Sequence, residues 1–402
     1  MDVSKLRKDF SLYATSDEII YFDNACATLK PEVVLAAMDE YNRHFPTCGG
    51  RSINRLGEWV TKAVEQSRSS VAKFINAKQA AEVLFVRNTT EGINLLAHSL
   101  DISAGDIILT TDKEHNSNLV PWQLAAKRNS AVHQVVPTHQ DGQFDMEAFE
   151  VALQSGRVRI VAMGMTSNLD GVTIPAKEIV AKAHQYDALV VLDAAQTAPH
   201  HPIDVQQLDV DFLVFSGHKL CGPSGTGVVY GKTALLESLP PFIAGGSTVS
   251  ETTYTGHTFL TAPEKFEGGT QDYAGIIGLG AAVEYVTSVG LSEIAAHQVA
   301  LNTHATKQLE SVPDISIIGP SDPVLRGGIV SFYIPGIDIH QIAVALDTAA
   351  GVQVRSGQHC VHSWFQARNI HGSVRASFYL YNTLAEVDVF VSAVKDVVSV
   401  YK

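Results

Sequence analysis

The chain has 402 residues, of which 46% are hydrophobic, and a formal net charge of -13. This length and apolar content are ample for a large hydrophobic core and for two domains. The negative charge, without any cluster of lysine and arginine, argues against nucleic acid or an anionic membrane surface as a partner.

The chain has no sequence feature of secretion or of membrane insertion. Its first ten residues lack the apolar stretch of a signal peptide, and no apolar run approaches the roughly 18 to 20 residues of a transmembrane helix. Four cysteines (Cys26, Cys48, Cys221 and Cys360) form no C-x-x-C pair. We therefore expect a cytoplasmic protein with free thiols.

A short apolar run, Val83–Val86, predicts the first strand of a sheet, and the segment 88–97 after it predicts a helix that begins with hydroxyl residues. Thr89 or Thr90 suits the N-cap of this helix. The free N–H groups and the dipole at a helix start bind phosphate well, so we expect a phosphate site there, with a plain helix cap as the alternative.

Two further buried strands are predicted, and each ends in polar residues. Ile107–Thr110 is followed by His115, and Arg159–Gly164 is followed by Asn168. A helix predicted over 175–184 then leads into the next strand. This repeated alternation of strand and helix is typical of a parallel sheet.

The densest group of polar residues follows the next two strands. The run 188–192 ends in Asp193 and Gln196, and the run 211–215 ends in Ser216, His218 and Lys219, followed by a glycine-rich stretch to Gly227. Ligand crevices in open α/β sheets lie at such strand ends, so these side chains are expected to converge on one crevice. The set suits pyridoxal phosphate.

Each group has a chemical reason to be there. Lys219 is the expected Schiff-base lysine, because a primary amine condenses reversibly with the aldehyde of the cofactor. Asp193 keeps the pyridinium nitrogen protonated, and Gln196 bonds the ring hydroxyl. Ser216 and His218 donate to phosphate oxygens.

The last hundred residues predict strands over 328–333 and 352–355, with an amphipathic helix over 340–349 between them. Arg355-Ser-Gly-Gln-His-Cys360 follows, and then Val374-Arg-Ala-Ser-Phe-Tyr-Leu-Tyr-Asn-Thr383. Arg375 suits a substrate carboxylate, since its guanidinium binds carboxylates bidentately.

Cys360 needs thiolate character to act as a nucleophile, which its neighbours His359 or Arg355 would favour. A packed free thiol or a His-Cys-Val-His metal site is the alternative for Cys360; no other cluster suggests a metal.

From about Tyr21 to Asn382 the chain resembles the class V aminotransferase branch of the fold-type I pyridoxal-phosphate enzymes, on the motifs D-A-A-Q, S-G-H-K and G-P-x-G-x-G. The R-x-G-x-H-C loop and the R-A-S-x-x-x-Y-N-T segment resemble the group II (SufS/NifS-like) cysteine desulfurases. This resemblance implies an α/β fold: a large domain, residues 17–262, with a mostly parallel seven-stranded sheet covered by helices, and a smaller α+β domain, residues 263–402, that carries the cysteine loop and on which residues 1–16 pack.

The resemblance also implies roles for individual residues. His115 stacks on the cofactor ring and shares in proton transfer, and Asn168 contacts cofactor or substrate. Thr270 reaches the cofactor phosphate of a neighbouring subunit, so a homodimer is expected. Arg51 and Arg355 join Arg375 in binding substrate. The chain departs from the family pattern at Asn116, Cys221 and Gln358.

The implied reaction converts L-cysteine into L-alanine and a persulfide on Cys360, which passes to a sulfur-acceptor protein or an iron–sulfur scaffold. L-selenocysteine fits the same site as a substrate. One alternative is another lyase or aminotransferase of this fold, such as a kynureninase-like enzyme, with Cys360 only structural. The other is an inactive, cofactor-binding partner in a sulfur-assembly complex, against which the intact Lys219, Asp193, His115 and Arg375 argue.

Overall fold

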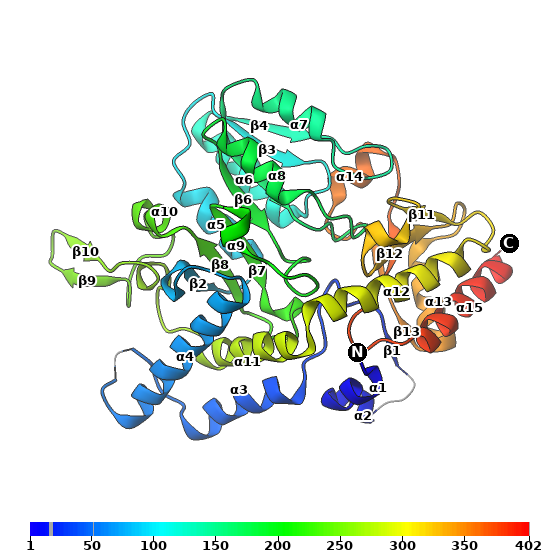
Figure 1. Cartoon of the computed structure of the whole chain (residues 1–402), viewed down its shortest axis with the longest axis horizontal. Helices are drawn as coiled ribbons and strands as arrows, with labels where there is room; N and C mark the ends of the chain where they lie inside the picture. Colours follow the sequence, from blue (N-terminus) through cyan, green and yellow to red (C-terminus); the bar gives the residue numbers. More distant parts are fainter. Residues whose placement is uncertain (16–18, 51, 402) are drawn as a thin grey trace.

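The computed structural model describes residues 1–15, 19–50 and 52–401 and contains a large sheet with helices on both faces (Figure 1). The sheet has seven strands in the order β2-β8-β7-β6-β5-β3-β4, and only β8 runs against the others. The expected fold class is therefore confirmed. The strands are β2 (Val83–Val86), β3 (Ile107–Thr111), β4 (Val132–Val136), β5 (Val158–Gly164), β6 (Leu189–Asp193), β7 (Phe212–Ser216) and β8 (Gly227–Gly231).

Successive side chains of these strands point alternately into two different hydrophobic cores. Phe212 and Val214 face one core, while Leu213 and Phe215 face the other, and all four side chains are fully buried. Because successive side chains of a strand point to opposite faces, a strand that is covered on both faces must be apolar throughout. This explains why the central strands contain almost no polar residues before their last position.

Helices cover both faces of the sheet (Figure 1). The first core contains side chains of α4 (Arg55–Phe74), α7 (Met146–Leu153), α8 (Ala176–His184) and α11 (Tyr273–Val289). The second contains side chains of α5 (Thr89–Ser99), α6 (Asn116–Asn129) and α10 (Thr233–Ser238). The remaining helices near the sheet are α3 (Glu32–His44), which packs on α11, and the short α9 (Val205–Leu208).

A smaller antiparallel sheet of four strands has the order β11-β12-β15-β14. Its own core includes Val330, Phe332, Val374 and Ala376, together with side chains from three helices. The strands are β11 (Ser316–Ile318), β12 (Ile329–Tyr333), β14 (Arg355–Gly357) and β15 (Ser373–Ser377); the helices of this part are α12 (Leu291–Leu309), α13 (Ile339–Ala350), α14 (His362–Ala367) and α15 (Leu384–Tyr401).

The N-terminal segment bridges the two parts of the molecule. α1 (Val3–Leu6) and α2 (Ser11–Thr15) flank Phe10, whose ring packs on Tyr285 of α11 and on Tyr381. β1 (Ile20–Tyr21) then pairs with β13 (Val352–Gln353) of the smaller part.

The expected domain boundary at residue 263 stays a prediction, and the packing supports a later one. Ile276, Leu279, Val283 and Val286 of α11 belong to the core of the large sheet, whereas most buried apolar residues of α12 belong to the core of the smaller one. We therefore propose a boundary near Gly290, between α11 and α12.

A hairpin of β9 (Val249–Thr252) and β10 (His257–Phe259) projects from the large domain (Figure 1).

One local expectation is corrected. The N-cap of α5 is Asn88, whose side chain accepts from Glu91 N–H, and Thr89 and Thr90, the expected N-cap candidates, are the first two helical residues. An asparagine competes well for an N-cap, so both assignments were compatible with the sequence.

Among the described residues, no single helix is long and apolar enough to cross a membrane; α11 and α12 meet the length and composition criterion only as a pair, and they are bent by 72° at their junction.

Candidate active site

A cavity of about 250 Å³ opens at the carboxyl ends of the parallel strands. It lies where the large sheet meets β14, β15 and the loop that carries Cys360. Its walls include most of the residues predicted from the sequence, namely Thr89, Thr90, His115, Asn168, Asp193, Gln196, Ser216, His218, Lys219, Arg355, Cys360 and Arg375. Thr270 lines a separate cavity, and Arg51 lies outside the described residues.

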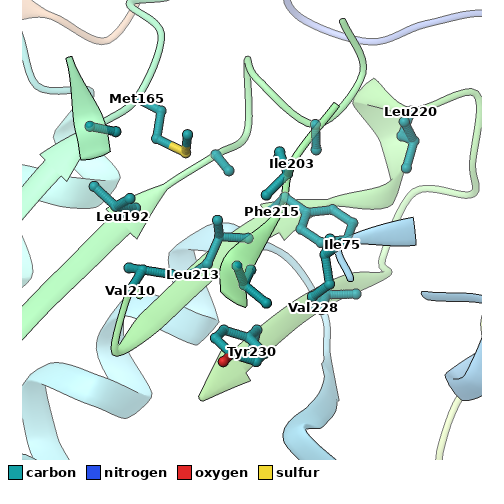
Figure 2. Close-up of a cluster of buried hydrophobic side chains, with 14 of the residues drawn as sticks. Ile75, Met165, Leu192, Ile203, Val210, Leu213, Phe215, Leu220, Val228 and Tyr230 are labelled. Atoms are coloured by element: carbon teal, nitrogen blue, oxygen red, sulfur yellow. The ribbon is translucent and has the colours of Figure 1, made fainter. Parts of the chain in front are cut away.

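Lys219 lies on a short 3-10 turn, Gly217–Lys219, directly after β7. The next residue, Leu220, is fully buried and belongs to the same hydrophobic core as Phe215 (Figure 2). Burying a leucine contributes about 2 kcal/mol, which anchors the turn and fixes the lysine at the cavity wall. Burial lowers the pKa of Lys219, and the nearby Asp193 carboxylate opposes this shift.

Asp193 and Gln196 lie at the end of β6 and are both buried. Asp193 Oδ1 accepts the Ala195 N–H at 2.9 Å, and burial raises the pKa of this carboxyl group. Gln196 Nε2 donates to the Ala25 carbonyl at 2.7 Å, while its Oε1 has no hydrogen-bond partner within the described chain.

The start of α5 meets the end of β7 in the same wall. Ser216 Oγ accepts the Thr89 N–H at 2.9 Å and lies 2.7 Å from Thr89 Oγ1. β8 begins against this helix start: a Cβ at Gly227 would lie 2.7 Å from Asn88 Cα, so only glycine fits there. Hydroxyl groups and a helix N-terminus thus form one anion-binding corner.

His115 is the N-cap of α6, and its Nδ1 accepts the Ser117 N–H at 3.1 Å. Burial lowers its pKa to about 3, and Lys219 and Arg375 act in the same direction. The ring is therefore neutral at physiological pH, and with Nδ1 as acceptor its proton sits on Nε2. A neutral, flat ring suits stacking against an aromatic cofactor.

Arg375 lies on β15 and is only 2% exposed. Its Nη1 donates to the Asn168 carbonyl at 2.9 Å, and its Nη2 lies 3.3 Å from Asp23 Oδ1. Nε has no partner among the described residues, although it is buried. A buried guanidinium with donor capacity left over is a receptor for a carboxylate.

Cys360 lies between β14 and α14 and is half-buried. Arg355 is on the same wall, and its Nη1 contacts Cys26 Sγ at 2.8 Å. The expectation that His359 supplies positive charge is wrong: its Nε2 bonds Ser373 Oγ at 2.8 Å, and burial strongly lowers its pKa, so the ring is neutral. Of the two residues expected to favour the Cys360 thiolate, His359 and Arg355, only Arg355 is positively charged.

The three departures from the family pattern lie in different surroundings. Cys221 is fully buried, and burial raises its pKa to about 12, so the thiol is protonated and inert. Gln358 is absent from the cavity wall, and its Nε2 donates to the His371 carbonyl at 3.3 Å. Asn116 contacts the Cys360 loop directly, since its N–H donates to the Cys360 carbonyl.

Two residues of the cavity wall were missed or misread. The sequence assigned no site role to Cys26, but it lines the cavity and contacts Arg355. Glu114 received no role, yet it lines the cavity and accepts from Thr111 Oγ1 and Asn118 Nδ2, each at 2.7 Å. Burial raises its pKa to about 7. The signal for Glu114 was its position in the sequence, between the end of β3 and His115.

The cavity fits pyridoxal phosphate on the chemistry of its walls. It offers the Lys219 amine, an anion-binding corner, a buried carboxylate and the unpartnered Oε1 of Gln196, which needs a polar partner. These four groups come from the ends of β6 and β7 and from the start of α5.

Comparisons with known proteins agree with this geometry. Residues 20–390 match the model of the family "Aminotransferase class-V". A cysteine desulfurase from an Enterobacter species is 41% identical to the chain, over 98% of this chain and 97% of that protein. The apo structure of a cysteine desulfurase from Thermococcus onnurineus superposes with a TM-score of 0.94 at 35% identity and covers 98% of both chains. The cysteine desulfurase CsdA from Escherichia coli superposes with a TM-score of 0.92 at 32% identity, over 100% of both chains. The chain therefore belongs to the class V aminotransferase family.

Proposed function

We propose that this protein is a cysteine desulfurase that converts L-cysteine into L-alanine and leaves a persulfide on Cys360. The observation that carries the proposal is the placement of Cys360, Lys219 and Arg375 on the walls of one cavity. An amine, a carboxylate receptor and a thiol are the three groups that this reaction needs from the protein. The relatives at about 40% identity that bear this activity in their names support the same proposal.

Pyridoxal phosphate is the proposed cofactor, and when bound it withdraws electrons from the α-carbon of the substrate. Lys219 would hold it covalently, Asp193 its ring nitrogen, Gln196 its hydroxyl group, and His115 the face of its ring. The residues that would hold the phosphate are Ser216, His218, Thr89 and Thr90. Asn168 would contact the cofactor or the substrate.

The substrate side of the cavity has its own assignments. Arg375, with its unpartnered Nε, would bind the α-carboxylate and orient the α-carbon. Lys219 would move the α-proton, since burial lowers its pKa and makes the neutral amine accessible. The Cys360 thiolate would attack the substrate sulfur, so that a sulfur–sulfur bond forms as the carbon–sulfur bond breaks. The electron pair of the broken bond stays with carbon, which takes a proton to give alanine.

A homodimer and a sulfur-acceptor protein are also proposed. Thr270 lies in a cavity of about 370 Å³ that does not include Lys219. In a homodimer, Thr270 would instead contact the cofactor phosphate of the second copy. The persulfide on a half-buried cysteine requires an acceptor thiol that can enter the cavity. The location in the cytoplasm remains a prediction from the sequence.

The test uses purified protein reconstituted with pyridoxal phosphate and given L-cysteine. Alanine and sulfide are measured for the wild type, for Cys360→Ala, and for Cys48→Ala, which removes an exposed cysteine outside the cavity. The proposal predicts that alanine formation is lost in Cys360→Ala and kept in Cys48→Ala. Equal alanine from all three proteins would make Cys360 structural, and no alanine from any would refute the activity.

A further inference from the structure

The loop that carries Cys360 is held in an uncommon backbone conformation. His359 has φ 48° and Cys360 has φ 60°, so two consecutive residues with side chains lie in the left-handed region. Such residues rarely adopt this conformation, and it persists only where neighbouring contacts enforce it. The contacts that hold this loop therefore determine where the Cys360 sulfur lies.

Among the described residues, three hydrogen bonds from the large domain reach this loop and the first residue of α14. Asn168 Nδ2 donates to the His359 carbonyl at 2.7 Å, and the Asn116 N–H donates to the Cys360 carbonyl, also at 2.7 Å. The third joins the Asn116 side chain to His362, with 2.8 Å between Nδ2 and Nδ1. Asn116 thus contacts the loop both at Cys360 and two residues beyond it.

The position of Asn116 links the Cys360 loop to the wall of the cavity. It is the first residue of α6 and follows directly on His115, the N-cap whose ring lines the cavity. α6 is fixed in turn by the buried Glu114, which accepts from Asn118. The hydrogen bonds of Asn116 therefore set Cys360 relative to His115, a residue of the proposed cofactor site.

We propose that Asn116 and His362 are positioning residues that hold Cys360 at the distance its attack on substrate sulfur requires. This inference rests on the proposed function. The pair acts on the sulfur-transfer step alone, because neither side chain belongs to the groups assigned to cofactor or carboxylate binding. Asn116→Ala keeps the backbone N–H bond to Cys360, so the variant isolates the side-chain contact.

The test is a double-mutant cycle on the reconstituted enzyme with Asn116→Ala, His362→Ala and the double variant. Ser363→Ala, at the adjacent exposed position of α14, is the matched control. Two reactions are measured: alanine formation from L-cysteine, and exchange of the α-proton of L-alanine with deuterium from solvent. The second reaction requires Lys219 and Arg375 but no thiol.

We expect each single variant to lose roughly tenfold in alanine formation, the cost of one hydrogen bond that fixes a reacting group. The double variant should lose no more than either single one, because the two side chains act as one contact. Proton exchange should stay within about twofold of wild type in all variants, since only the sulfur-transfer step depends on the pair. Ser363→Ala should match the wild type in both reactions.

Three results would overturn the inference: wild-type alanine formation in His362→Ala, additive losses in the double variant, or an equal loss of proton exchange, which would indicate general damage to the site. Failure of the proposed function is distinguishable from these, because the wild type itself would then form no alanine.

Deuterium uptake of the peptide backbone around Cys360 supplies a readout that needs no substrate. It should rise in His362→Ala and not in Ser363→Ala, and unchanged uptake in His362→Ala would refute the contact.

Discussion

Arg375 Nη1 donates a 2.9 Å hydrogen bond to the backbone carbonyl of Asn168, and this bond joins β15 of the small sheet to the loop after β5 of the large one. The Asn168 side chain donates in turn to the His359 carbonyl, next to Cys360. The proposed carboxylate receptor and the proposed nucleophile are thus fixed to the same residue. Substrate orientation and thiol position are therefore expected to depend on each other.

We predict that Arg375→Lys lowers kcat/KM for L-cysteine by about 10- to 100-fold, because lysine keeps the charge but loses the guanidinium fork. Steady-state kinetics on the reconstituted enzyme measure this. Arg368→Lys is the control, since Arg368 pairs with Asp112 and is absent from the cavity wall. An unchanged kcat/KM in Arg375→Lys would remove Arg375 from substrate binding.

The four cysteines should differ in reactivity. Cys360, Cys26 and the exposed Cys48 are accessible, whereas Cys221 is fully buried with a pKa raised to about 12. We expect iodoacetamide to modify the first three in the native protein and Cys221 only after denaturation, because the thiolate is the reactive form. Peptide mass spectrometry reads out each site. Fast native labelling of Cys221 would contradict the buried placement.

Gly227→Ala should weaken pyridoxal phosphate binding. Its Cβ would meet Asn88 at 2.7 Å and displace the start of α5, where the phosphate site is proposed. A titration followed by cofactor absorbance gives the affinity. Gly256→Ala, where the nearest atom to the new Cβ is 3.8 Å away, should bind as the wild type does. Equal affinity in both variants would mean that the phosphate does not lie at this corner.

Acid should destabilise the apo protein in part through His200. Burial lowers the pKa of His200 from 6.5 to about 3, so the unfolded chain takes up this proton first. The contribution of the neutral His200 side chain to the free energy of unfolding is therefore complete above about pH 6.5, and it is lost as the pH falls toward 3.

In His200→Asn, the free energy of unfolding should fall less steeply between pH 6 and 4, by up to about 1.4 kcal/mol per pH unit. Urea unfolding at several pH values measures this slope. His44→Asn, at an exposed position of α3, serves as the control. A slope for His200→Asn that equals the wild-type slope would show that His200 does not contribute.

Much of the site was predictable because its residues follow strands whose apolar runs are plain in the sequence. Asp193 and Lys219 each come within a few residues of such a strand end, and parallel strands bring these ends to one edge. Cys360 and Arg375 were identified by their motifs rather than by periodicity. The order of the sheet strands did not need to be known for any of the four.

Other features depend on contacts between distant segments, which a sequence pattern does not record. Cys26 and Arg355 are separated by 329 positions, and Asn116 and His362 by 246. His359 was misread for the opposite reason: it is adjacent to Cys360 in sequence, but its ring turns to Ser373 in the core. Whether a polar side chain faces a cavity or a neighbour is decided by tertiary packing.

The most direct test of the central claim is mass spectrometry of the holoenzyme after brief exposure to L-cysteine without reductant. We expect the mass of one added sulfur atom on the peptide that contains Cys360, removed by a thiol reductant, together with an equal amount of alanine. We expect no added sulfur on the peptide with Cys26. Alanine formed without added sulfur on Cys360, or with the sulfur on Cys26 in Cys360→Ala, would contradict the assignment of Cys360 as the nucleophile.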